Sequence, residues 1–109
     1  HQHLGGYIRI MAIQLDLTTS QYGTPFAGAY FRIATAAVSR MRGTDPKFSV
    51  MVDVAGYATS DPDDDTRDVD FRRYHVDLAS VEAMTGATFL DKCYAWVMTQ
   101  DDMAGSVAV

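Results

Sequence analysis

Apolar and polar residues alternate along much of the chain, and this alternation predicts a protein built mainly from β-strands. The clearest stretch is 48–58 (FSVMVDVAGYA), where every second position in the first part is apolar. The residues on this face are Phe48, Val50, Val52 and Val54. Because successive side chains of a strand point to opposite faces of its sheet, this pattern indicates a strand with one buried face.

Three further segments are predicted to be strands from their β-branched, aromatic and alternating apolar residues. They are 7–17, 29–41 and 69–78. The turn at 42–47 contains Gly43 and Pro46, and it is short enough to join 29–41 and 48–58 as a hairpin.

Two of these strands carry signs of irregularity. Small residues at 35–37 indicate a bulge or a break in the strand 29–41. In 69–78 the apolar positions change phase at Arg72 and Arg73, which predicts a β-bulge there. Beyond this strand, 80–84 is predicted to form a helical turn capped by Ser80.

A period near 3.6 residues replaces the alternation only in 88–105, and it predicts one clear helix. Two sets of apolar residues repeat at i, i+4 and i+7: Phe89, Cys93 and Trp96, and Leu90, Tyr94 and Val97. Their broad face is wide enough to cover a sheet. Thr88 with Asp91 resembles a capping box at the start of the helix. After it, Met103 is expected to fold back as an apolar plug and Gly105 to redirect the backbone.

These elements predict a fold that is mainly β with one C-terminal α-helix. The expected architecture is a small β-sandwich or partly open barrel with the helix packed on one sheet. One β-rich domain is predicted over 11–109, and residues 1–10 are expected to be an N-terminal extension or arm, because Met11 and Ala12 resemble the start of a bacterial product. Two interpretations of 107–109 stay open: a short edge strand, or a frayed end.

Composition excludes several classes of function. The 109 residues are 48% hydrophobic, enough for one folded domain, and their formal net charge is −5. An acidic chain without a basic stripe argues against nucleic-acid binding. No apolar run approaches the roughly 18 residues of a membrane-spanning helix. Cys93 is the only cysteine, and its place in the apolar helical pattern predicts a buried residue rather than a reactive thiol.

The acidic loop 59–68 is the first candidate for chemistry. Asp61, Asp63 and Asp65 match the first half of a calcium-binding loop. The match then fails, because Thr66 stands where that loop needs glycine and Arg72 stands where it needs glutamate. A solvated hairpin loop is therefore predicted and no metal ligand is assigned, with bound calcium as the minor alternative.

His75 is the second candidate, since Arg73 and Asp77 are predicted to share its face of the strand. A cross-strand surface pair explains this arrangement better than a catalytic dyad. No nucleophile and base can be paired from the sequence, so no catalytic residue, metal site or cofactor is predicted, and the chain is not expected to be an enzyme.

Two stretches resemble a known class of proteins. The segment GAYFRI (28–33) resembles the "-DAY-RI-" opening of many small proteins encoded among the structural genes of tailed bacteriophages. The segment CYAWVMTQDDMAGSVAV (93–109) resembles their closing pattern: a helix with tyrosine, an acidic turn, Ala-Gly and a final apolar residue. The positions that carry it are Tyr94, Val97, Thr99, Asp101, Asp102, Met103, Ala104, Gly105 and Val109. The likeness runs over about 11–109; the first ten residues and the acidic loop depart from it.

This resemblance implies a virion structural protein, made in the host cytoplasm and located in the phage particle. The tail, its fibre-attachment region or the baseplate is the expected place, with assembly in several copies beside other virion proteins. A capsid decoration protein and a carbohydrate-binding module for host adsorption are the alternatives. The predicted contacts between subunits are first the arm, with Tyr7, Ile8, Ile10, Ile13, Leu15 and Leu17, and second the C-terminal Val107 and Val109.

Overall fold

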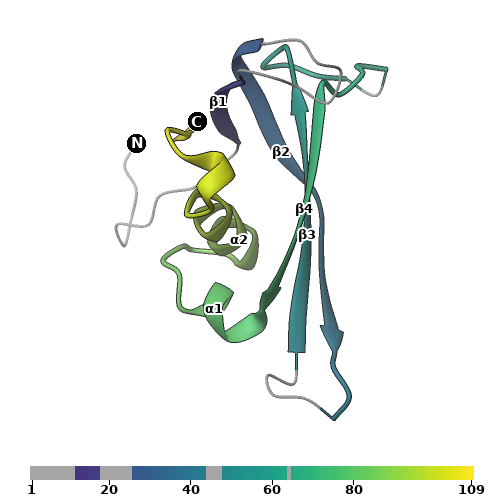
Figure 1. The fold of residues 1–109 in the computed structure, drawn as a ribbon, viewed down its shortest axis with the longest axis vertical. Helices are drawn as coiled ribbons and strands as arrows, with labels where there is room; N and C mark the ends of the chain where they lie inside the picture. The colour runs from purple at the N-terminus through teal and green to yellow at the C-terminus, as the bar shows by residue number, and fades with distance from the viewer. Residues whose placement is uncertain (1–11, 18–25, 44–47, 64) are drawn as a thin grey trace.

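The computed structural model describes residues 12–17, 26–43, 48–63 and 65–109. Its strands are β1 (Ile13–Leu17), β2 (Phe26–Arg40), β3 (Phe48–Tyr57), β4 (Asp70–Asp77) and β5 (Val107–Ala108). Its helices are α1 (Leu78–Glu82), α2 (Phe89–Met98) and the short 3-10 helix η1 (Asp101–Met103). All five strands form one antiparallel sheet in the order β4-β3-β2-β1-β5 (Figure 1).

The three helices lie on one side of this open sheet, and no described element covers the other side (Figure 1). The prediction of a mainly β chain with a helix packed on its sheet is confirmed. The second layer of the fold is made of helices, where a sandwich would have a second sheet. The core between the layers contains Ile13, Leu15, Phe31, Val50, Val52, Val54, Val81, Cys93, Tyr94, Val97 and Met103.

The paired strands β2 and β3 confirm the predicted hairpin and the predicted bulge. Their register shifts between Ile33 and Thr35, one residue ahead of the expected place. At this point the Ile33 N–H donates a 2.9 Å hydrogen bond to the Tyr94 hydroxyl of α2. The bulge is therefore also a point of attachment between the sheet and the helix layer.

Strand β4 has no β-bulge, contrary to the sequence prediction. It pairs with β3 without any shift from Asp70 to Asp77, so the bulge predicted at Arg72 and Arg73 is wrong. Regular alternation places Arg72 and Tyr74 on the helix side and leaves Phe71 on the uncovered side, 44% exposed. The apparent change of phase arose because a charged residue points inward and an aromatic one outward.

The helix α1 begins two residues before the predicted turn. Its N-cap is Asp77, whose carboxylate accepts hydrogen bonds from the N–H and the hydroxyl of Ser80 at 3.0 and 2.7 Å. Ser80 is therefore a donor inside the first turn, and the predicted Ser80 cap is wrong. Aspartate and serine are both favoured at N-caps, and this helix starts early enough for Asp77 to take that position.

The helix α2 and the end of the chain follow the sequence prediction closely. Thr88 caps α2 by accepting a 3.1 Å hydrogen bond from the Asp91 N–H. Met103 is fully buried in the core, and Gly105 takes the positive φ of +86° that its turn requires. The chain then returns as β5 beside β1, which resolves 107–109 in favour of an edge strand.

Candidate interaction surfaces

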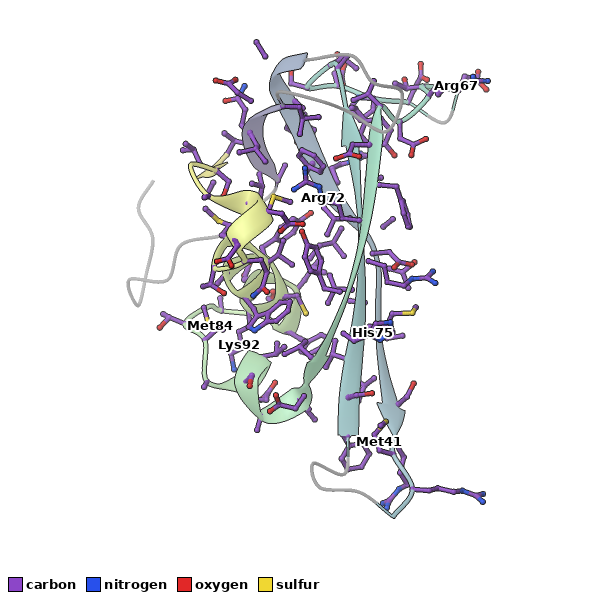
Figure 2. The ribbon with its side chains drawn as sticks, in the orientation of Figure 1. Met41, Arg67, Arg72, His75, Met84 and Lys92 are labelled. Atoms are coloured by element: carbon purple, nitrogen blue, oxygen red, sulfur yellow. The ribbon has the colours of Figure 1, made fainter. Side chains whose placement is uncertain are left out.

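The uncovered side of the sheet, which we call the outer face, carries side chains from its three longest strands. They include Arg32 of β2, Met51, Ala55 and Tyr57 of β3, and Phe71 and His75 of β4. Figure 2 shows Arg72 pointing toward the helices and His75 pointing away from them, as strand alternation requires.

An ion pair lies in the middle of the outer face. Asp53 and Arg73 are opposite one another on β3 and β4, and the guanidinium donates two hydrogen bonds to the carboxylate at 2.7 and 3.0 Å. These hydrogen bonds hold the pKa of Asp53 below its ordinary value. Asp53 is only 5% exposed, whereas the side chain of Arg73 is 53% exposed. The carboxylate is therefore covered by its partner, and Arg73 remains accessible to another molecule.

Aromatic side chains flank this pair. Phe71 is 44% exposed, an unusual position for a phenylalanine on a sheet face that meets water. The Arg32 guanidinium lies 5.3 Å from the centre of the Tyr57 ring, in the range of a cation–π contact. The ion pair at the centre of the outer face therefore has aromatic neighbours, of which Phe71 is the most exposed.

The β2–β3 hairpin projects past α1 at one end of the molecule (Figure 1). Val38 and Met41 in this part are 47% and 42% exposed. The Arg40 guanidinium lies 5.0 Å from the centre of the Phe48 ring, and both Arg40 and Arg42 are exposed. This end therefore combines apolar side chains with positive charge.

A polar cluster on the helix side joins β4 to η1. Arg72 donates to the Asp70 carboxylate at 3.0 Å and to the Asp102 carbonyl oxygen at 2.6 Å. The Tyr74 hydroxyl donates to the Asp102 carboxylate at 2.9 Å, and its ring meets Trp96 edge-on at 5.9 Å. Burial, reinforced by Asp102, raises the pKa of Tyr74 to about 12, so this hydroxyl stays protonated. The cluster secures the end of the chain against β4.

The acidic loop is organised by its own hydrogen bonds. The Asp63 carboxylate accepts from the Asp65 N–H at 3.0 Å and from the Thr66 hydroxyl at 2.9 Å, while that hydroxyl accepts from the Asp63 N–H. The Thr66 hydrogen bond lowers the pKa of Asp63. No group of three or more histidine, cysteine or acidic side chains suited to a metal occurs among the described residues.

The two reactive residue types that the sequence singled out lie apart. Cys93 is fully buried in the core, where desolvation and then the charge of Glu82 raise the pKa of its thiol to about 11. His75 is exposed on the outer face, opposite Met51. The sheet separates them, so they form no nucleophile–base pair.

The predicted interface residues divide into three groups. Ile13, Leu15 and Leu17 lie in the core, at 0%, 8% and 5% exposure, and β1 has β2 on one side and β5 on the other. The prediction that this strand offers its apolar side chains to a neighbour is therefore corrected, because the chain's own helices use them. Tyr7, Ile8 and Ile10 lie outside the described residues.

The third group is the C-terminal pair. Val107 and Val109 are 59% and 46% exposed at the edge of the sheet, and Val109 exchanges two backbone hydrogen bonds with Ala12 at 2.9 and 3.1 Å.

Sequence reasoning missed the centre of the outer face, Phe71 with the Asp53–Arg73 pair. The apolar pattern carried no signal for it, because the inward Arg72 and the outward Phe71 reverse the expected alternation.

Comparison with protein-family models, curated proteins and solved structures found no match. Within the described part of the chain, no helix is both long enough and apolar enough to cross a membrane.

Proposed function

We propose that this chain is a non-enzymatic structural protein of a tailed bacteriophage particle that acts by assembly in several copies. Its place is the tail, the fibre-attachment region or the baseplate, and it reaches the virion after synthesis in the host cytoplasm. The observation that carries the proposal is the outer face, where the exposed Phe71 lies beside Tyr57 and Met51 and which the chain's own described elements leave uncovered.

An uncovered sheet face normally carries polar side chains that alternate with the buried ones. Here the exposed Phe71 and the partly exposed Tyr57 and Met51 share that face with Arg32, Arg73 and His75. Aromatic, methionine and arginine side chains are the types enriched at contact sites between proteins. An assembly role therefore accounts for residues that an isolated domain would not need.

The resemblance of 28–33 and 93–109 to small phage structural proteins supports the assignment to a virion. The carbohydrate-binding alternative needs exposed aromatic side chains beside acids at a loop tip. The acidic loop 59–68 has no aromatic residue, and the exposed Phe71 lies within a strand. The geometry therefore favours assembly over sugar binding.

The decisive test is quantitative mass spectrometry of purified particles made by the phage genome that encodes this chain. We expect the chain in a fixed ratio to the major tail protein after nuclease treatment and density-gradient purification. A non-structural protein of the same genome is the control for carry-over from the lysate. A chain found only at the level of that control would overturn the proposal.

A further inference from the structure

We infer that the outer face binds the outer face of a second copy of this chain, with the strands of the two copies running antiparallel. This inference rests on the proposed function, because it names the partner of the same surface. It commits to one geometry, a two-fold axis that lies between the two faces and runs perpendicular to their strands.

The two ends of the long sheet carry opposite charge. At one end, the described residues of 59–68 include four aspartates and one arginine, which gives a net charge of −3. At the other end, Arg40 and Arg42 give +2 over 40–43, with Arg40 beside Phe48 on the helix side of the strand and Arg42 at the exposed end. Figure 2 places Arg67 and Met41, which mark these segments, at opposite ends of the molecule.

The distance between the two ends is large enough for each charged end to interact independently with another molecule. β3 has 10 residues, so about 33 Å of strand lies between the ends at the usual rise per residue. The Debye length at physiological salt is only about 8 Å, so the charges of one copy do not neutralise each other. A second copy that lies antiparallel places its basic end against the acidic end of the first copy and its acidic end against the basic end of the first. Two attractive contacts therefore form.

The same charges reject the other two-fold arrangement. With the axis parallel to the strands, the two acidic loops would meet, and so would the two basic hairpin ends. Figure 1 shows the β3–β4 connection leaning toward the side away from the helices, which brings the acidic loop closer to a facing copy. Like-charge contact at both ends would therefore oppose that arrangement.

The middle of the face supplies the apolar contact. Phe71, Tyr57 and Met51 are available there, and Arg32 and the half-exposed Arg73 surround them. Arginine and aromatic side chains are the types enriched at protein interfaces. Because Arg73 already neutralises Asp53, pairing two faces does not bury an uncompensated carboxylate.

The available area predicts a weak complex in isolation. Three strands spaced about 4.8 Å and about 33 Å long give a flat area of roughly 480 Å² per copy. Two copies bury about twice that, which is close to the ~1,000 Å² expected of a specific interface. We therefore expect a micromolar dimer in solution, strengthened inside a particle where neighbouring contacts raise the effective concentration.

The experiment is light scattering of the full chain over a concentration series, at low and at high salt. Phe71→Glu is the test variant, and Leu90→Glu is its matched control, because Leu90 is 45% exposed but lies on α2, on the other side of the sheet. We expect a dimer, a rise of at least about tenfold in Kd for Phe71→Glu, and little change for Leu90→Glu. Circular dichroism confirms that each variant is folded.

A charge swap tests the orientation. Arg40→Glu with Arg42→Glu makes both ends of the sheet acidic, and Asp61→Lys with Asp65→Lys removes the net negative charge of the acidic end. In the antiparallel dimer, each double variant alone should bind more weakly than the wild type, and an equimolar mixture of the two should bind more tightly than either variant alone. In the parallel arrangement, Asp61→Lys with Asp65→Lys would instead strengthen the dimer, because it removes the repulsion between the two acidic loops. Glu82→Lys with Asp101→Lys changes the net charge as much on the helix side and should leave the dimer intact.

A monomer at every concentration, or equal Kd values for Phe71→Glu and Leu90→Glu, would overturn the inference. A tighter dimer for Asp61→Lys with Asp65→Lys, or a mixture no tighter than its components, would overturn the antiparallel arrangement. These results are separable from the proposed function: a chain abundant in particles but monomeric in solution, with Phe71→Glu incorporated normally, overturns the dimer and leaves the virion role standing. A dimer absent from particles does the reverse.

Discussion

The contact between Gly56 and Phe31 provides a stringent test of the packing between β2 and β3 on the core side of the sheet. Gly56 of β3 faces the Phe31 ring across the β2–β3 pairing. A Cβ at position 56 would lie 2.6 Å and 2.8 Å from two carbons of that ring, well inside van der Waals contact. The ring would have to move by about 1 Å to restore an ordinary carbon–carbon separation of about 3.5 Å.

The ring has little freedom to make that movement. Phe31 is fully buried, and the Arg72 guanidinium lies 5.2 Å from its ring centre. Overpacking a core in this way typically costs about 1–3 kcal/mol. Replacing glycine in a strand also removes chain entropy from the unfolded state, which returns about 0.5–1 kcal/mol. We therefore expect Gly56→Ala to lower the free energy of unfolding by about 1.5 kcal/mol.

Urea denaturation followed by circular dichroism measures this change. With a slope of about 1.5 kcal/mol per molar urea, the midpoint should fall by about 1 M. The same substitution in a Phe31→Leu background should cost less, because the smaller side chain leaves room for the new methyl group. A Gly56→Ala protein as stable as the wild type, or a cost that is equal in both backgrounds, would refute the packing argument.

Three further predictions concern single side chains. Tyr94→Phe removes the acceptor of the Ile33 N–H at the β2 bulge and should lower stability by about 1–2 kcal/mol, and an unchanged urea midpoint would contradict this role. The Arg73 hydrogen bonds lower the pKa of Asp53 in the folded state, so their contribution is present above the ordinary value of 3.8 and is lost as pH falls through the folded pKa. Wild type should therefore be more stable than Asp53→Asn at neutral pH, and this difference should shrink on acidification; an acid titration of the two melting temperatures tests the sign. The buried Cys93 thiol, with a pKa of about 11, should react with a thiol reagent at about pH 8 only as fast as the protein opens, and rapid labelling of the native protein would disprove its burial.

Sequence periodicity predicted the elements whose burial follows a simple period. The strand β3 buries Val50, Val52 and Val54 on one face, and the helix α2 presents the apolar face that its spacing indicated. The Thr88 cap was readable because it depends on residues three apart in the chain. These features are local, so a single sequence contains them.

The pairing of distant segments could not be predicted in the same way. Alternation correctly indicated that β1 has one buried face, but it did not indicate which molecule would cover that face. The covering residues come from the other end of the chain, since Met103 of η1 belongs to the core and β5 pairs beside β1. Burial within the chain and burial between chains leave the same local pattern, which is why β1 was assigned to an interface.

The strand β4 has a polar cluster on its helix side and an exposed aromatic residue on the outer face. Its inward Arg72 and Tyr74 are satisfied by Asp70 and Asp102, so each buried polar group has a partner within the chain. On the opposite side of the same strand, Phe71 has no covering element among the described residues. Burying an arginine while exposing a phenylalanine is unfavourable for an isolated domain. The charged group loses contact with water, and the apolar ring gains it. The arrangement becomes consistent when a second molecule covers the outer face, since Phe71 is then buried and the Arg72 cluster still holds the end of the chain in place.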